Sequence, residues 1–437
     1  MKVAGDIAML RYSIWTIGCQ MNKAESQRIA SYLNSAGHHE VKSPREADLV
    51  VLNTCVVRQS AEGKVLGMLG QLKGLKREHA DTHVLVTGCF VDSHVEDLKK
   101  RFPHVDFFFK PGAYSDFLSW LQEQGVPVNQ SRQLSADSFQ TIPSDSSPCA
   151  YVPIIQGCNN FCSFCIVPYR RGKEVSLPVE EVVCEAEELV SQDIKEITLL
   201  GQNVDSYGRD LPGHPDLADL LYRLSEIDGL SRIRFLTNHP KDVSRKLIEA
   251  VVSLDKVCKY LELPVQSGDD DILKAMKRGY TIEQYRELVR VIRERLPQAS
   301  LSTDVIVGFP GETEEQFERT FSLLKEIRFD VVHMAAYSPR SGTLAWRKYE
   351  DNVPPEVKKE RLRKVEQLQA SVAGEINSDY MGKEVEVLVE GNKKGKWYGR
   401  TEGNKLVFFQ GDADCSGKLV KVNVEKTSPW ALQGKYA

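Results

Sequence analysis

The sequence predicts an α/β protein made of two successive parallel α/β domains and a small C-terminal β-barrel. In residues 11–126 and again in residues 148–377, short apolar runs alternate with stretches of helical spacing, as in βα units. In residues 378–437, alternating polar and apolar runs are separated by glycines, which is typical of strands. We expect residues 127–147, a polar stretch with several Ser, Gln and Asp residues, to link the first two domains.

The composition is that of a globular protein. Hydrophobic residues make up 41% and charged residues 27% of the 437 residues, and the net charge of −4 excludes a wholly basic nucleic-acid coat while leaving room for a local basic patch. The sequence contains no run of about 18 apolar residues, so it predicts no membrane span. The apolar stretch within Met1–Leu10 is too short for a signal peptide. We therefore expect a cytoplasmic protein, in which clustered cysteines are metal ligands or catalytic groups.

Three cysteines follow the first three predicted strands of the N-terminal domain. The strands are Tyr12–Ile17, Leu49–Leu52 and His83–Thr87, the helices are Ala24–Ala36 and Ser60–His79, and the cysteines are Cys19, Cys55 and Cys89. Because neighbouring parallel strands end at one edge of a sheet, their thiols would meet there. From the residues alone, metal ligands and small buried core residues are equally good interpretations.

The second domain has the pattern of a partial (β/α)6 barrel. Its predicted strands are Tyr151–Ile155, Glu196–Leu200, Arg232–Leu236, Tyr260–Leu263, Ser300–Val307 and Val331–Ala336. Its clearest helices are Pro178–Gln192, Ile282–Arg295 and Glu314–Ile327. In such folds the chemistry gathers at the C-terminal ends of the strands.

A charged helix, Val357–Ile376, precedes the C-terminal barrel. We predict an antiparallel barrel of the oligonucleotide-binding kind from the strands Glu384–Glu390, Trp397–Glu402, Lys405–Phe409 and Leu419–Glu425. Aromatic residues stand among basic ones in this segment: Trp397, Tyr398, Phe408 and Phe409 amid Lys393, Lys394, Lys396, Arg400 and Lys405. Such groups can stack on bases and bind phosphates, although we expect one Phe to belong to the barrel core.

The strongest chemical signal is the loop that contains Cys158, Cys162 and Cys165, with three and then two residues between the cysteines. Three thiolates in one loop can hold a four-iron cluster and leave one iron open to an outside ligand. The alternative is a zinc site that borrows a distant fourth ligand, since structural zinc sites have four.

This loop resembles the CxxxCxxC loop of the radical S-adenosylmethionine (SAM) superfamily. The resemblance implies SAM bound to the open iron and cleaved to a 5′-deoxyadenosyl radical, so that no catalytic side chain is assigned. It also implies cofactor contacts in the polar loops after the second, fourth and fifth barrel strands: Gly201, Gln202, Asn203, Gln266, Ser267, Asp304, Ile306 and Gly308. Asp304 stands where the family's GxIxGxxGE element has its first Gly.

Further segments resemble the methylthiotransferase family within that superfamily. They are Gly18-Cys19-Gln20-Met21-Asn22, Asn53-Thr54-Cys55, Thr87-Gly88-Cys89, the run Arg170-Arg171-Gly172-Lys173-Glu174, and Tyr337 to Thr343. The C-terminal barrel is similar to the family's TRAM domain. This resemblance implies a second [4Fe-4S] cluster on Cys19, Cys55 and Cys89 and two roles for SAM, as methyl donor and as radical source. Leu177 departs from the family, which usually has Arg there.

Three substrates are open within the family. They are N6-isopentenyladenosine at tRNA position 37, threonylcarbamoyladenosine at the same position, and an aspartate of a ribosomal protein. The segments Gly18 to Asn22 and Leu263 to Ser267 favour the first, with the methylthio group placed at C2. A tRNA partner would contact Tyr169, Arg170, Arg171, Lys396 and Arg400, although the three loop residues fit a solvated loop equally well.

The other expectations concern partners and the remaining cysteines. We expect a monomer that takes electrons from a flavodoxin or ferredoxin system, with no membrane and with a sulfur source that the sequence leaves unknown. Four cysteines lack partner spacing and are interpreted as packing or surface residues: Cys149, Cys184, Cys258 and Cys415. A zinc-bearing RNA-binding protein without catalysis is the alternative of a different class.

Overall fold

The structure is a computed structural model that describes residues 9–56, 59–91, 95–128, 147–411 and 414–437. The chain divides into two compact units. The N-terminal unit contains the residues up to 146 with 156–158 and 166–173, and the C-terminal unit contains 147–155, 159–165 and 174–437. Most of the predicted linker, residues 129–146, lies outside the described residues.

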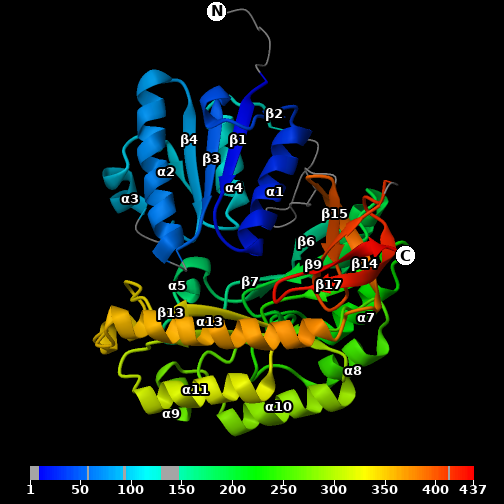
Figure 1. The fold of residues 1–437 in the computed structure, drawn as a ribbon. Helices are drawn as coiled ribbons and strands as arrows, with labels where there is room; N and C mark the ends of the chain where they lie inside the picture. The colour runs from blue at the N-terminus through cyan, green and yellow to red at the C-terminus, as the bar shows by residue number, and fades with distance from the viewer. Residues whose placement is uncertain (1–8, 57–58, 92–94, 129–146, 412–413) are drawn as a thin grey trace, which may run out of the picture. The chain divides into compact units, whose positions relative to one another are not determined.

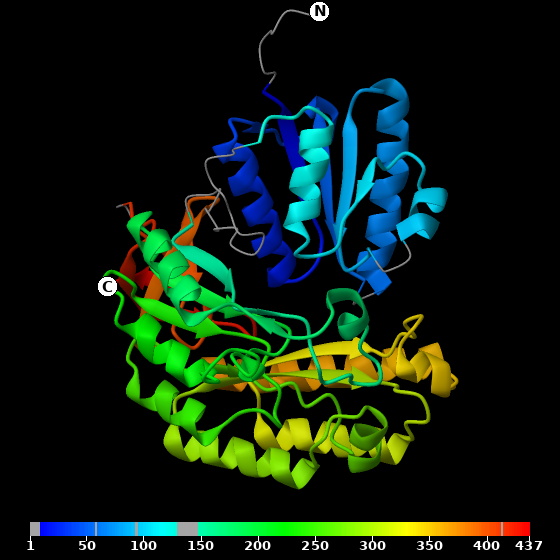
Figure 2. The ribbon, with the colours of Figure 1, turned by 180° about the vertical axis from the view of Figure 1, so that it is seen from behind.

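The N-terminal unit is a five-stranded parallel sheet between two layers of helices (Figures 1 and 2). The strand order is β2-β1-β3-β4-β5. The strands are β1 (Arg11–Thr16), β2 (His39–Glu40), β3 (Leu49–Thr54), β4 (His83–Gly88) and β5 (Phe107–Phe108). The helices are α1 (Gln20–Ser35), η1 (Pro44–Glu46), α2 (Gln59–Glu78), α3 (Val95–Arg101), α4 (Tyr114–Glu123) and α5 (Val167–Arg171). The three predicted strands and two predicted helices are confirmed.

Each face of this sheet has its own apolar core. One cluster joins α1 and α4 to the sheet through side chains such as Ile29, Leu33 and Phe117. The other joins α2 and α3 to the opposite face through Val65, Leu69 and Leu98. Because β3 and β4 are covered on both faces, they are apolar throughout most of their length rather than alternating.

The C-terminal unit begins with an open parallel barrel. Its β-strands before the final barrel are β6 (Cys149–Pro153), β7 (Ile155–Gln156), β8 (Val175–Ser176), β9 (Glu196–Leu200), β10 (Arg232–Phe235), β11 (Tyr260–Glu262), β12 (Ser300–Val307) and β13 (Val331–Ala336). The helices are α6 (Val179–Ser191), η2 (Val204–Ser206), α7 (Leu217–Ser225), α8 (Arg245–Ser253), α9 (Asp270–Ala275), α10 (Ile282–Arg295), α11 (Glu314–Ile327), α12 (Leu344–Lys348) and α13 (Pro355–Ser378).

Six of these strands correspond to the six parallel strands predicted for a partial barrel. They are arranged as two three-stranded sheets, β10-β9-β6 and β11-β12-β13. An isolated parallel bridge between Ile233 and Val257 lies at the seam between β10 and β11. One large apolar cluster fills the space between these strands and the surrounding helices. The predicted ranges of α10 and α11 match the structure, because Thr281 and Thr313 cap their first turns.

The C-terminal barrel is closed, in the order β14-β15-β16-β18-β17. Its strands are β14 (Glu384–Lys393), β15 (Lys396–Arg400), β16 (Leu406–Gln410), β17 (Leu419–Thr427) and β18 (Leu432–Tyr436). The prediction of a wholly antiparallel barrel is wrong at one pair, since β16 and β18 run parallel. Sequence patterning missed β18, which supplies only one buried apolar side chain, Leu432. In the described residues, no helix is both long and apolar enough to cross a bilayer.

Buried arginines of β10 fix the C-terminal barrel to the parallel sheet. Arg232 donates from Nη1 to the carbonyl oxygen of Arg400 at 2.8 Å, and Arg234 donates from Nη1 to that of Glu402 at 2.9 Å. Arg234 also pairs with the buried Glu196 at 3.0 Å, so its charge is balanced. The barrel is therefore attached through hydrogen bonds from buried guanidinium groups.

Candidate functional site

The three N-terminal cysteines lie at one edge of the sheet. Cys19 occupies the N-cap of α1 after β1, and Cys55 and Cys89 directly follow β3 and β4, so that the three neighbouring strands β1, β3 and β4 each lead to a cysteine. A Cβ at Gly18 would lie 2.9 Å from Cys55 Cβ, which shows how closely the loop before Cys19 approaches Cys55. The thiol of Cys19 is also near enough to raise the pKa of Cys89, after the larger effect of burial. The predicted convergence of the three strand ends is confirmed.

A pair of buried asparagines fixes the loops that carry these cysteines. Asn22 accepts a hydrogen bond from the backbone N–H of Cys19 at 3.2 Å and donates from Nδ2 to Asn53 Oδ1 at 2.8 Å. Asn53 donates in return to the backbone oxygen of Asn22 at 2.8 Å. Both side chains are fully buried. Asn22 and Asn53 lie within the segments that carry Cys19 and Cys55 and resemble the methylthiotransferase family. The sequence predicted no separate role for these two asparagines.

Arg171 is a buried partner of this cysteine edge. Its Nε donates to Cys89 Sγ at 3.3 Å, and its two terminal nitrogens bind the Glu25 carboxylate at 2.5 and 3.3 Å. The side chains of Arg171 and Glu25 are only 2% and 6% exposed. Arg171 is thus occupied inside the N-terminal unit and is not presented to an RNA phosphate, contrary to the sequence-based prediction. The role of Glu25 was missed, since a buried charge is recognised only when its partner is known.

A tight turn shapes the central cysteine loop. The backbone N–H of Cys165 donates to the carbonyl oxygen of Cys162 at 3.0 Å, so these two cysteines flank one turn. Between them, Ser163 donates from its backbone N–H to Met276 at 2.9 Å and from Oγ to Ala275 at 2.8 Å. Gly157, which precedes Cys158, has φ of +82°, and a Cβ there would lie 2.0 Å from the oxygen of Lys173. Only glycine fits that position.

Arg278 is the buried partner of the central loop, and sequence analysis missed it. It lies just after α9, is 5% exposed, and donates from Nη1 to Cys162 Sγ at 3.3 Å. Its Nη2 donates to the carbonyl oxygen of Pro264 at 2.7 Å, and its Nε donates to the Tyr280 hydroxyl at 3.2 Å. The guanidinium therefore bridges the end of β11 to the cysteine loop.

Buried polar atoms without partners gather at the C-terminal ends of β9 and β10. Asn203 donates to Asp242 at 2.9 Å and Asn238 donates to Asp205 at 2.6 Å, which leaves the Oδ1 atoms as acceptors. Among the described residues, neither Oδ1 nor His239 Nε2 has a hydrogen-bond partner, although all three are buried. Burial and nearby cations lower the pKa of His239 to about 2, so its imidazole is neutral. Buried polar groups in this state indicate a place for a polar ligand.

The remaining predicted cofactor residues differ in their surroundings. Gly201 must be glycine, because a Cβ would lie 2.4 Å from Ile155 Cγ2, and its neighbour Gln202 is half-buried. Gln266 has a φ of 72° and is joined through its backbone to Asp304 and Ile306 at 2.8 and 3.0 Å. The hydroxyl of Ser267 is already within 3.3 Å of both Thr320 Oγ1 and the backbone nitrogen of Asp269, so it helps to build the loop.

The fifth-strand element continues this edge of the barrel. Gly308 has a φ of 70° and donates its backbone N–H to Glu312 at 2.6 Å. Ile306 packs against a small apolar cluster that includes Phe309. Asp304 lies near Glu262 at the end of β11, and burial, together with this second carboxylate, raises the pKa of Glu262 to about 7. The sequence did not predict a role for Glu262, because its proximity to Asp304 depends on the pairing of β11 with β12.

The predicted RNA-contacting residues are mixed in exposure. Tyr169 is 43% exposed and Lys396 is exposed, whereas Arg170 and Arg400 are half-buried, and Arg400 donates to the oxygen of Asn404 at 3.2 Å. Lys405 is buried in an ion pair with Asp330, so it does not belong to a phosphate-binding surface.

The remaining predictions about the barrel aromatics and the other cysteines agree with the structure. Phe409 is in the barrel core, as expected for one of the Phe residues. Cys258 and Cys415 are buried, Cys149 is half-buried and Cys184 is exposed, in agreement with packing and surface roles. Leu177 packs against the main core, and its backbone bonds to Ile154 and Tyr207.

The donor set of the two cysteine loops bears on the group that they could hold. In the part of the chain that the structure describes, no three Cys, His, Asp or Glu side chains are close enough to hold one metal ion. Thiolates bound to different irons of a cluster need not approach each other so closely. Together with the buried guanidinium donors and the unpartnered atoms near Asn203, the donor set fits iron–sulfur clusters and a polar cofactor.

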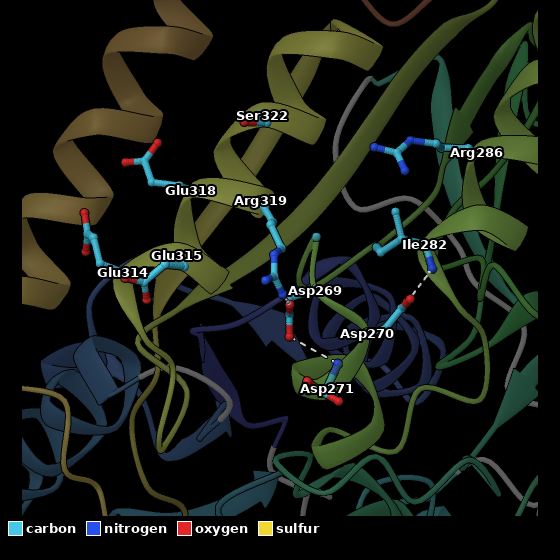
Figure 3. A pocket seen from close by; sticks show the side chains of 11 residues that line it. Asp269, Asp270, Asp271, Ile282, Arg286, Glu314, Glu315, Glu318, Arg319 and Ser322 are labelled. Atoms are coloured by element: carbon cyan, nitrogen blue, oxygen red, sulfur yellow. Dashed lines mark hydrogen bonds and ion pairs between the residues drawn. The ribbon is translucent and has the colours of Figure 1, made fainter.

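A separate hollow of about 730 Å³ lies between α9, α10 and α11 and is shown in Figure 3. Carboxylates line much of it, including Asp270, Glu314 and Glu318, and Asp269 is bound by Arg319. No cysteine is among its lining residues. Its charges serve helix capping and surface ion pairs, as with Asp269 at the start of α9.

The fold agrees with three family models. Residues 152–324 match the Radical SAM superfamily, residues 11–110 match the uncharacterized protein family UPF0004, and residues 379–437 match the TRAM domain. A solved structure, the radical SAM methyltransferase TsrM from Kitasatospora setae with cobalamin and a [4Fe-4S] cluster bound, has a TM-score of 0.58 at 15% identity. The match covers 78% of this chain and 77% of that one, and it shows likeness of fold. The fold and the CxxxCxxC loop thus define a radical SAM protein.

Similar proteins with curated names show which family of radical SAM proteins the chain belongs to. The tRNA-2-methylthio-N(6)-dimethylallyladenosine synthase of Dehalococcoides mccartyi (strain CBDB1) is 50% identical over 97% of this chain and 98% of its own. A protein of the same name from Roseiflexus sp. (strain RS-1) is 47% identical over 98% of this chain and 90% of its own length. Another, from Dictyoglomus thermophilum, is 45% identical over 98% of this chain and 98% of its own length. The chain belongs to the tRNA-2-methylthio-N(6)-dimethylallyladenosine synthase family.

Proposed function

We propose that this chain inserts a methylthio group at C2 of N6-isopentenyladenosine at position 37 of tRNA, using one SAM as methyl donor and another as radical source. The observation that carries the proposal is that Cys19, Cys55 and Cys89 follow three neighbouring strands at one edge of the sheet. A radical SAM protein needs only its central cysteine loop to make a radical. A second set of three thiols, which follows three strands of the N-terminal sheet and has its own buried arginine, supports a second reactive centre.

The two sets of cysteines would hold two [4Fe-4S] clusters. Cys158, Cys162 and Cys165 would bind the first, and the three N-terminal cysteines the second. When bound, the clusters and SAM supply the one-electron chemistry and the sulfur that these side chains lack. The protein's own contribution is to fix the thiolates, through the asparagine pair at Cys19 and the turn at Cys162.

Cofactor orientation is proposed for the ends of the barrel strands. The Oδ1 atoms of Asn203 and Asn238 can accept hydrogen bonds from ammonium or hydroxyl groups, and the neutral His239 can donate one from Nε2. Gly201 and Gly308 are predicted cofactor contacts through their backbone, although the space beside them is taken by Ile155 and Lys358. Gln202, Gln266 and Asp304 are the predicted polar contacts. Because Asn203, Asn238 and His239 are buried, they would act in a part of the site with little water.

The tRNA side of the reaction is assigned to exposed residues. Lys396 and its neighbours Lys393 and Lys394 lie in the β14–β15 hairpin and can bind phosphates, which give affinity without sequence information. Tyr169 is exposed and can stack on a base that leaves the helical stack to reach the site. The proposal includes a flavodoxin or ferredoxin system as the electron donor. It also includes a monomeric state and a cytoplasmic location.

Mass spectrometry of tRNA nucleosides tests the function directly. Cells that lack the gene should accumulate N6-isopentenyladenosine and lose its 2-methylthio derivative, and the intact gene should restore the product. A Cys55→Ala gene should not restore it, whereas Cys184→Ala, which changes an exposed cysteine, should. Loss of 2-methylthio-threonylcarbamoyladenosine or of a ribosomal-protein modification, with the isopentenyl product unchanged, would assign the chain to another substrate.

A further inference from the structure

Two fully buried arginines each donate a hydrogen bond to one cysteine of one cluster site. Arg171 Nε lies 3.3 Å from Cys89 Sγ, and Arg278 Nη1 lies 3.3 Å from Cys162 Sγ. Neither contact was expected from the sequence. Hydrogen bonds to cluster sulfurs and the net charge around them set the reduction potential of an iron–sulfur cluster.

The two arginines differ in how their charge is balanced. Arg171 is bound by both oxygens of Glu25, so this pair brings no net charge to Cys89. Arg278 has a carbonyl oxygen, a hydroxyl and the ring of Tyr280 as its neighbours. Within the described ranges of the chain, Arg278 forms no salt bridge with Asp or Glu.

A buried cation without a carboxylate is costly unless an anion lies beside it. At Arg278 that anion must come from Cys162 and the group bound to it. A one-electron reduction adds negative charge next to the guanidinium, so Arg278 favours the reduced state. At Cys89 the Glu25 carboxylate offsets the same effect of Arg171, because the two opposite charges are in contact.

We propose that Arg278 raises the reduction potential of the central cluster, whereas Glu25 cancels this effect of Arg171 at the N-terminal cluster. The difference directs electrons from a one-electron donor to the cluster that cleaves SAM. Arg278 is in this sense a positioning residue, because it acts through Cys162. The proposal rests on the proposed function, since it requires a cluster at each site.

The test measures the midpoint potential of each cluster separately in the full-length chain. Cys19, Cys55 and Cys89 are changed to Ala to leave the central cluster, and Cys158, Cys162 and Cys165 are changed to Ala to leave the N-terminal one. Iron content is determined first, and reduction is then followed by electron paramagnetic resonance at controlled potentials. The two midpoints are compared with those of the variants below.

Arg278→Gln should lower the ratio of reduced to oxidised central cluster about tenfold at a fixed potential. This corresponds to a midpoint potential that is lower by ~59 mV for a one-electron couple. Arg278→Lys, which keeps the charge, should lower it less. Glu25→Gln should have the opposite effect and raise the potential of the N-terminal cluster, because it leaves Arg171 unbalanced. Arg286→Gln is the matched control, since it removes an exposed cation of the same unit, and it should leave both potentials unchanged.

Each result bears on the proposal. An unchanged potential in an iron-loaded Arg278→Gln protein overturns the role of Arg278. If that variant does not load iron, an unchanged potential in Glu25→Gln overturns the proposed asymmetry, and a raised one supports it. Failure of the proposed function is seen separately, as tRNA that lacks the methylthio product while the potentials still shift as described.

Discussion

Lys405 of the C-terminal barrel forms a buried ion pair with Asp330, which precedes β13 of the parallel barrel. Their Nζ and Oδ1 atoms are 2.6 Å apart, and the side chains are 8% and 9% exposed. Asp330 also accepts a hydrogen bond from the backbone N–H of Leu301 at 2.9 Å. The basic residue that composition assigned to RNA binding is thus part of the attachment between two segments of the C-terminal unit.

Lys405→Met should lower the free energy of unfolding by about 3–5 kcal/mol, because it leaves the Asp330 carboxylate buried without its cation. Chemical unfolding of the protein without clusters, followed by fluorescence and by circular dichroism, measures the change. Arg295→Met is the control, because it breaks an exposed pair with Glu249 and should hardly alter stability. Equal stabilities of the Lys405→Met and parent proteins would show that the pair adds nothing to the attachment.

The Glu262 carboxyl should make the protein less stable as the pH rises. Burial and the Asp304 carboxylate raise its pKa in the folded state to about 7, above the unfolded value of 4.5. Between these values the unfolded chain releases the proton and the folded chain retains it, so stability falls as the pH increases through this window. Glu262→Gln should therefore be more stabilising, relative to the parent, at pH 8 than at pH 5. A stability difference that is the same at both pH values would contradict the raised pKa.

The two cysteine sets should have separable activities. Cys162→Ala should abolish production of 5′-deoxyadenosine, because the central cluster cannot form properly without this ligand. Cys55→Ala should leave SAM cleavage in place while methylthio product disappears, since only the N-terminal site is changed. Both products are quantified by chromatography of the same reaction, after the iron content is determined. Methylthio product at the normal rate from Cys55→Ala would show that the N-terminal site has another role.

Lysines of the β14–β15 hairpin should contribute to tRNA affinity. Lys394→Gln combined with Lys396→Gln should weaken binding and reduce the slope of log affinity against log salt by about 1.5, since two phosphate contacts would be lost. Lys421→Gln combined with Lys435→Gln removes the same charge from strands of the same barrel, where the lysines pair with Glu384 and Glu425. This control should bind nearly as well as the parent, and equal slopes in both double variants would place the RNA contacts elsewhere.

Substitution is a better test of the barrel than its deletion. Deletion would remove the carbonyl oxygens of Arg400 and Glu402, which accept hydrogen bonds from Arg232 and Arg234. These two arginines would then be left on an uncovered sheet, so that a loss of activity could come from damage to the parallel barrel. The hairpin lysines are exposed and can be changed without disturbing that contact.

Periodic and strongly apolar segments were the parts of the fold that sequence could predict. Strands β3 and β4 are covered on both faces and therefore read as continuous apolar runs, and α10 and α11 begin at Thr caps. Two-residue strands such as β2 and β5 have too few residues to show a period. The parallel pairing of β18 with β16 depends on closure of the barrel, which no local pattern encodes.

At the candidate site, the cysteines were predictable and their buried partners were not. Regular spacing marked Cys158, Cys162 and Cys165, and the alternation of strands and helices placed Cys19, Cys55 and Cys89 at one edge. Glu25 and Arg278 look like ordinary surface charges in the sequence, because burial and partners appear only after segments more than a hundred residues apart meet. For the same reason Arg171 and Lys405 were assigned to RNA although each forms a buried ion pair.

Closure of the C-terminal barrel by β18 has a consequence for biosynthesis. The barrel that covers Arg232 and Arg234 is complete only when β18 pairs with β16 and β17, roughly two hundred residues after these arginines. At a translation rate of about 5–20 residues per second, the arginines wait about 10–40 s for the barrel to be completed. During that interval the nascent chain exposes an unfinished sheet face at β10, which only the completed barrel covers.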